Sequence, residues 1–296
     1  MTFNNNANIE SDDVQKRRGG GRTAMIGGGG VLGLIVVALV SQFLGVDVSG
    51  VVGGLTGDSN TSTTSTDLSA DLDKCKTGAD ANSDDECRMQ GAAKSLNVYW
   101  SGQLSDYAKP GFVLVDGETS TPCGTASNAV GPFYCPSDQT IYIDTSFWQV
   151  LRRDFDATAG PLAQMYVLAH EWGHHVQNET GAFAAHQSRE TGAASDSVRL
   201  ELQADCYAGA WVAAASTTTD ENGVALLQQP TTDQITDALN AASAVGDDHI
   251  QQQSGVTTNS ESWTHGSSAQ RQKWFNAGYA GGPQRCDTFS VSAGQL

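Results

Sequence analysis

Polar and apolar stretches divide the first quarter of the chain into three segments. Residues 1–23 are polar, residues 24–45 carry no charged side chain, and residues 46–73 are rich in Gly, Ser, Thr and Asp. An uncharged run of about 20 residues is long enough to cross a bilayer, and glycine is tolerated in membrane helices. A stretch rich in Gly, Ser and Thr cannot bury a core. We therefore predict a tail, a transmembrane helix and a flexible stalk, followed by a folded domain at 74–290.

Charges on the two sides of the apolar run predict its direction in the membrane. Basic residues precede the run and acidic residues follow it. The positive-inside rule then places the N-terminus in the cytoplasm and the folded domain outside. A cleaved signal peptide is the alternative, although the run is long for one and no clear cleavage site of small residues follows. The sequence thus predicts a single-pass protein of the cell membrane with an extracytoplasmic domain.

Hydrophobic spacing within 74–290 changes between the periods of strands and helices. Two short apolar runs at 111–116 and 139–144 are typical of strands. Helical spacing predicts helices over 146–158, 161–178, 196–216, 231–250 and 267–279. We expect an α+β domain that is mostly helical with a small sheet. An edge strand of this sheet would be able to bind an extended peptide through main-chain hydrogen bonds.

All six cysteines follow the predicted membrane helix. An even number confined to the outer part predicts disulfides formed in an oxidising compartment. Two pairs lie 12 residues apart, which favours Cys75–Cys87 and Cys123–Cys135 and leaves Cys206–Cys286. Sequence alone does not choose among the 15 pairings that six cysteines allow. A thiolate zinc site is the weaker alternative, because no pair has the C-x-x-C spacing.

The predicted helix at 161–178 contains the pattern His170-Glu171-x-x-His174. Positions i and i+4 lie on one face of a helix, about one turn apart, so both imidazoles can bind one zinc ion. Glu171 lies about 100° further round the helix. It is therefore a poor third ligand but well placed to accept a proton from an activated water. Two surface histidines beside a salt-bridged glutamate are the alternative interpretation.

A hydrolytic zinc site needs a third protein ligand and an open position. The predicted helix at 196–216 carries Glu201 and Asp205 at i and i+4, so both carboxylates lie on one face. Glu201 is the candidate third ligand. Asp205 is the candidate acceptor for the other ring N–H of a ligand histidine, which would fix its tautomer. The alternative is that one of the two acids only pairs with Arg199 or caps a turn.

Three sequence motifs together resemble the bacterial neutral zinc metallopeptidase family. They read HEWGHHVQ at 170–177, ELQADCYAG at 201–209 and THGSSAQRQKWFNAG at 264–278. The resemblance covers roughly 75–287 and implies a zincin-like domain, zinc (Zn²⁺) bound by His170, His174 and Glu201, and catalysis by Glu171. Members of this family commonly have one predicted membrane span. The resemblance supports peptidase chemistry but identifies no substrate.

A later His and Arg have a spacing that is also similar to a wider group of zinc peptidases. In some of those enzymes a pair spaced H-x5-R contacts the substrate or transition state, and His265 and Arg271 have this spacing. They are therefore candidates for stabilising the oxyanion. The alternative is that His265 caps the next helix and Arg271 pairs with an acid.

The charge of the whole chain excludes one class of partner. The chain has 33 acidic and 16 basic side chains, a net charge of −17. Binding nucleic acid needs clustered Lys and Arg, so we expect none. The sequence predicts a membrane-anchored zinc endopeptidase that acts on peptides or proteins. Two rivals remain, a zinc-binding pseudopeptidase that acts as an interaction module and a disulfide-bonded surface scaffold without metal.

Overall fold

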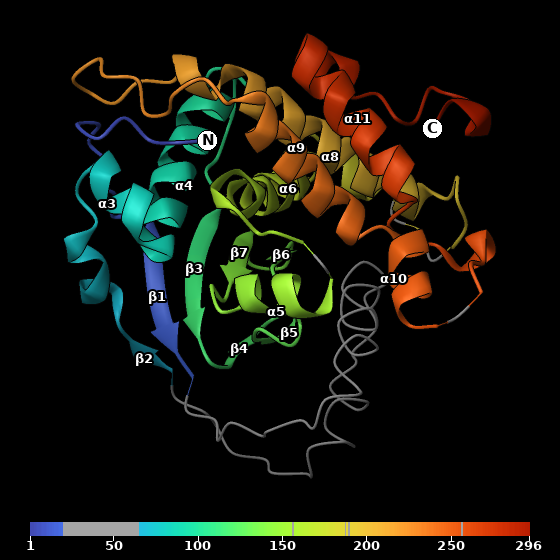
Figure 1. The fold of residues 1–296 in the computed structure, drawn as a ribbon, viewed down its shortest axis with the longest axis horizontal. Helices are drawn as coiled ribbons and strands as arrows, with labels where there is room; N and C mark the ends of the chain where they lie inside the picture. Colours follow the sequence, from blue (N-terminus) through green and yellow to red (C-terminus); the bar gives the residue numbers. More distant parts are fainter. Residues whose placement is uncertain (20–64, 156, 187, 189, 256) are drawn as a thin grey trace.

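The computed structural model describes residues 1–19, 65–155, 157–186, 188, 190–255 and 257–296 (Figure 1). The predicted membrane helix at 24–45 and residues 46–64 of the predicted stalk lie outside these residues, whereas residues 65–73 include β2 (Thr66–Asp67) and the start of a 3₁₀ turn. In the part of the chain that is described, no helix combines the length and the apolar character needed to cross a bilayer.

A small mixed sheet forms one side of an α+β domain. The strands run in the order β2 (Thr66–Asp67), β1 (Val14–Arg18), β3 (Gly111–Asp116), β7 (Thr140–Ile143) and β6 (Phe133–Cys135). The central strands β1, β3 and β7 are parallel, and the two edge strands are antiparallel to their neighbours. A separate hairpin joins β4 (Thr119–Thr121) to β5 (Gly124–Ala126). The two predicted strands are confirmed as β3 and β7.

The first 18 residues pack into this domain, whereas the sequence predicted a separate cytoplasmic tail at 1–23. Strand β1 pairs with β3 along its whole length, and Phe3 and Ile9 are buried in the main core. The basic residues of β1 pair with acids of the domain, Lys16 with Glu86 at 2.9 Å and Arg18 with Asp116. Strand β1 also pairs with β2, with Arg18 opposite Thr66, so residues 19 and 65 lie at the same end of these two strands.

Helices cover the sheet and carry most of the core (Figure 1). They are α3 (Gly78–Ser83), α4 (Asp85–Ser101), α5 (Phe147–Asp154), α6 (Pro161–Glu179), α7 (Ala182–His186), α8 (Asp196–Ala214), α9 (Thr232–Ala244), α10 (Asp247–Gln253) and α11 (Ser268–Gly281). Short 3₁₀ turns lie at Ser69–Lys74, Ala215–Thr217, Ser260–Ser262, Pro283–Arg285 and Ala293–Gln295. The sequence predicted one helix over 231–250, but it is broken after Ala244. Gly246 lies so close to the main chain of Ser268 that a Cβ there would be 2.6 Å from its nitrogen.

Small residues let the three helices that carry the predicted motifs pack closely. A Cβ on Gly173 of α6 would lie 2.9 Å from the Cα of Ala204 in α8. A Cβ on Gly278 of α11 would lie 1.8 Å from the carbonyl oxygen of Cys206. Only glycine permits such an approach of two backbones. This packing brings the polar faces of α6, α8 and α11 together inside the domain.

The three predicted disulfides are confirmed. Cys75–Cys87 joins the first 3₁₀ turn region to α4, and Cys123–Cys135 joins the β4–β5 hairpin to the edge strand β6. Cys206–Cys286 ties α8 to the segment that follows α11. The last two disulfides therefore restrain elements that border the polar cluster described next.

Candidate metal centre

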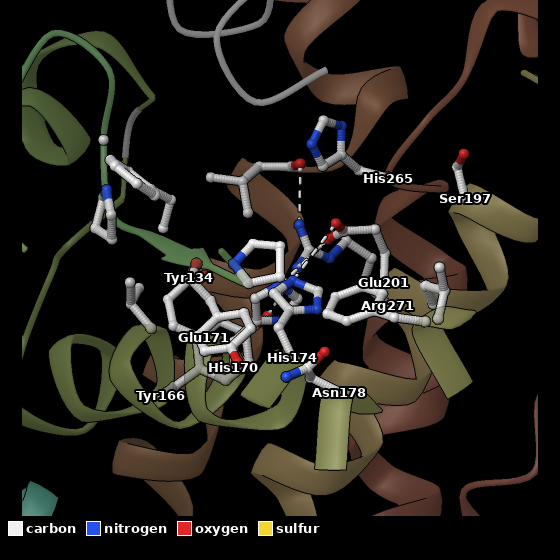
Figure 2. A pocket seen from close by; sticks show the side chains of 18 of the residues that line it. Tyr134, Tyr166, His170, Glu171, His174, Asn178, Ser197, Glu201, His265 and Arg271 are labelled. Carbon is white, nitrogen blue, oxygen red and sulfur yellow. Dashed lines mark hydrogen bonds and ion pairs between the residues drawn. The ribbon is translucent and has the colours of Figure 1, made fainter. Parts of the chain in front are cut away.

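The side chains of His170, His174 and Glu201 converge at the contact between α6 and α8 (Figure 2). One oxygen of Glu201 lies 3.1 Å from His170 Nε2, and the other lies 3.6 Å from His174 Nε2. Two ligands bound to one tetrahedral zinc ion are separated by about 3.4 Å, given zinc–ligand distances of about 2.1 Å. All three residues are buried, with at most 7% exposure. The spacing of their donor atoms fits one metal ion.

Hydrogen bonds at the far side of each ring hold both histidines in the orientation that a metal needs. His170 Nδ1 lies 2.9 Å from Asp205 Oδ1, and His174 Nδ1 lies 2.9 Å from Gln177 Oε1. Gln177 is itself held through its amide, which donates to the carbonyl of Leu200 at 2.6 Å. With Nδ1–H donated outward, each Nε2 faces Glu201 and, once it carries no proton, offers its lone pair to a metal. The donor set therefore fits zinc in chemistry as well as in spacing.

Asp205 is the centre of a buried polar network behind His170. It is fully buried and receives a two-pronged ion pair from Arg271, with N–O distances of 2.8 and 2.9 Å. The hydroxyl of Tyr166 also donates to Asp205. Arg271 further bonds to the carbonyl of Val245 in the break between α9 and α10. The predicted partner role of Asp205 thus has a geometric basis, and Arg271 pairs with an acid, as the alternative interpretation expected.

Burial and neighbouring charges set different protonation states for the three candidate ligands. Burial opposes the charged form of His170, but attraction to Asp205 and hydrogen bonds to Asp205 and Glu201 outweigh it and raise its pKa to about 10. Burial lowers the pKa of His174 to about 4. Glu201 is also buried, yet the nearby His265, His170 and His174 hold its pKa well below the ordinary value. In the metal-free protein a proton on His170 therefore balances the Glu201 charge.

Glu171 lies beside these residues and faces a cavity of about 380 Å³. Burial, together with the nearby Glu201, raises its pKa to about 7. The cavity floor follows one face of α6, at Val167, Glu171, His174 and Asn178. Apolar side chains that also line the cavity are Phe147, Leu151, Phe183, Leu200, Ala241 and Val245. A carboxylate with a raised pKa in an apolar cavity is typical of a group that exchanges protons during catalysis.

Comparison with known proteins gives a family for this arrangement. A family model described as "Putative neutral zinc metallopeptidase" matches residues 3–289. The chain belongs to this family. It is 52% identical over 224 residues to "Uncharacterized protein Rv2575" of Mycobacterium tuberculosis, an overlap covering 75% of this chain and 76% of the relative. It is 37% identical over 304 residues to "Uncharacterized protein YpfJ" of Escherichia coli K12, covering 96% and 97% respectively. No solved structure matches the chain.

In this neutral zinc metallopeptidase family member, His265 reaches the cavity from the loop before α11. Its Nδ1 lies 3.2 Å from Asp247 Oδ1, and the other oxygen of Asp247 accepts the main-chain N–H groups of Thr264, His265 and Gly266. Although burial opposes it, attraction to Glu201 and Asp247 raises the pKa of His265. Its alternative role as a helix cap is not seen, because Ser267 caps α11. The geometry gives a buried imidazole fixed by an acid and lining the cavity.

Sequence reasoning missed three polar residues that hold this site together. Asp247 and Gln177 orient His265 and His174, but neither forms a recognisable motif with its partner. The third is His175. It is fully buried, with its Nε2 2.6 Å from the carbonyl oxygen of Ala108 and its Nδ1 3.2 Å from the hydroxyl of Tyr134 in β6. These contacts depend on the fold, and no pattern in the sequence indicates them.

Proposed function

We propose that this protein is a zinc-dependent endopeptidase that hydrolyses peptide bonds in the cavity above α6. The observation that carries the proposal is the convergence of His170, His174 and Glu201 beside the cavity-facing Glu171. Among the described residues this cluster offers three ligands, and a zinc site with three protein ligands keeps a position for water or substrate. A structural zinc site would usually have four. This count favours the peptidase over the zinc-binding interaction module.

The protein's own residues would have separate roles in hydrolysis. Bound zinc supplies the Lewis acidity that polarises a carbonyl and activates water. Glu171 accepts the proton of the attacking water and delivers it to the leaving amine. His265, held by Asp247 and lining the cavity, donates a hydrogen bond to the developing oxyanion. Arg271 acts indirectly by holding Asp205, because its guanidinium is engaged with that carboxylate.

The edge strand β6 is the candidate binding site for the main chain of the substrate. It lies at the end of the sheet next to α6, and Phe133 and Tyr134 line the cavity. A zincin-like arrangement of a zinc helix beside an edge strand is part of this proposal. Peptides bound to such strands gain main-chain hydrogen bonds that do not depend on sequence.

The proposal extends to the place where the enzyme works. Three disulfides favour an oxidising compartment, so we place the described domain, together with residues 1–19, outside the cytoplasm. Contact with the membrane through residues 24–45 remains part of the proposal.

A direct test incubates the full chain with a peptide library after removal of metal and after return of zinc. Cleavage that a chelator abolishes and one equivalent of zinc restores is the expected result. Stoichiometric zinc binding without any cleavage would instead support the interaction module, and absence of zinc binding would refute both.

A further inference from the structure

The helix α7 places one large apolar side chain at the cavity. Its sequence is Ala-Phe-Ala-Ala-His, and none of these residues is buried. Phe183 is half-buried, packs against the main core and also lines the cavity. Elsewhere in the described chain, Val98 is the only large apolar side chain that is exposed. Phe183 therefore presents part of its ring to the cavity.

The ring of Phe183 belongs to an aromatic wall of the cavity, defined here as Phe183 and Tyr134. Their rings are nearly parallel, with an angle of 8° and a centroid separation of 6.4 Å. Phe183 also stacks on the ring of His174, with centroids 5.8 Å apart. The wall thus lies directly beside a candidate metal ligand. A substrate residue next to the bond being cleaved would have to pass along it.

A hydrogen bond fixes the position of Tyr134 in this wall. Its hydroxyl lies 3.2 Å from His175 Nδ1, within hydrogen-bonding distance. The lining of the cavity is mainly apolar, and its acidic and guanidinium groups, Glu171, Glu201 and Arg271, belong to the candidate metal centre and its supporting network. A charged substrate side chain against the aromatic wall would therefore lose water without gaining a partner of its own. The chemistry of the wall suits a flat or bulky apolar side chain.

Building on the proposed peptidase function, we propose that the aromatic wall is a subsite that selects a bulky apolar or aromatic substrate side chain. Phe183 is its specificity-determining residue. The wall contacts the substrate side chain beside the cleaved bond and takes no part in proton transfer.

The test compares pairs of peptides that differ in one residue, phenylalanine or alanine, placed in turn on either side of the cleaved bond. At one of these positions, zinc-loaded wild type should cleave the phenylalanine peptide with a kcat/KM about 10-fold higher or more. Phe183→Ala should reduce this preference to about 2-fold by slowing only the phenylalanine peptide. Phe183→Leu should restore part of the preference. Val98→Ala, which removes an exposed apolar side chain from α4, should behave as wild type.

Two results would overturn the subsite while leaving the peptidase intact. The first is an equal loss of kcat/KM for both peptides, or a loss of bound zinc, in Phe183→Ala. Either outcome would mean that the ring only supports His174. The second is a preference for phenylalanine that Phe183→Ala does not change. If wild type cleaves neither peptide, the proposed function fails, and binding decides the subsite. N-acetyl-phenylalaninamide should then bind the zinc-loaded protein more tightly than N-acetyl-alaninamide only when Phe183 is present, and equal binding would overturn the proposal.

Discussion

Replacing Arg271 by methionine tests whether this residue serves the buried network or the substrate. Arg271 is 3% exposed and Asp205 is fully buried, and their two short contacts are the main compensation for burying the carboxylate. Removing one partner of a buried ion pair typically costs about 3–5 kcal/mol. Because Tyr166 and His170 still bond to Asp205, we expect a value near the lower limit, about 3 kcal/mol.

This loss is measurable by urea unfolding of the metal-free protein with its disulfides intact. With an m-value of about 3 kcal/mol/M, the midpoint should fall by about 1 M. Zinc affinity should also fall, by about 10-fold or more, because Asp205 would no longer hold His170 firmly. Arg285→Met, which removes an exposed guanidinium from the turn after α11, should leave both quantities unchanged. If Arg271→Met keeps the wild-type midpoint and zinc affinity but loses kcat, Arg271 acts on the substrate instead.

Two further predictions concern the N-terminal strand and the protons of the site. Phe3→Ala should lower the free energy of unfolding by about 3–5 kcal/mol, since Phe3 is 1% exposed. The control Asn6→Ala changes an exposed residue and should leave this free energy unchanged. Equal stability of the two variants would show that residues 1–18 lie outside the domain. Zinc binding at pH 8 should release about one proton, because the pKa of His170 is raised to about 10 and its Nε2 proton must leave. Affinity should therefore weaken as the pH falls. Calorimetry in buffers of different ionisation enthalpy measures this release, and a value of zero would contradict the network.

Local pattern was sufficient to predict the elements that carry the candidate ligands. Helical spacing predicted α6 and α8 within two residues at each end, and the i, i+4 rule placed the polar residues of each helix on one face. The disulfides followed from simple spacing because two of them close short loops. Glu201 was expected as the third ligand from its place on the second helix and from the family resemblance, and the glycine-mediated packing of α6 on α8 gives its contact with the histidines a physical basis.

Pairing between strands and side chains far apart in the chain could not be predicted from the sequence. Strand β1 has only one buried side chain among its five residues, and its partner β3 lies almost a hundred residues further along the chain. Its basic residues resembled a signal for membrane orientation, but Lys16 and Arg18 are explained by ion pairs within the domain. Asp247 was missed for a related reason, because it is 18 residues from His265 and its role depends on how two loops meet.

The central claim is most directly tested by measuring zinc content and peptide hydrolysis together in Glu171→Gln. Glutamine has nearly the same shape as glutamate but does not accept the proton of an attacking water. The account predicts one zinc ion per chain, as in wild type, and a fall in kcat of at least about 100-fold. Hydrolysis at the wild-type rate with zinc still bound would contradict it.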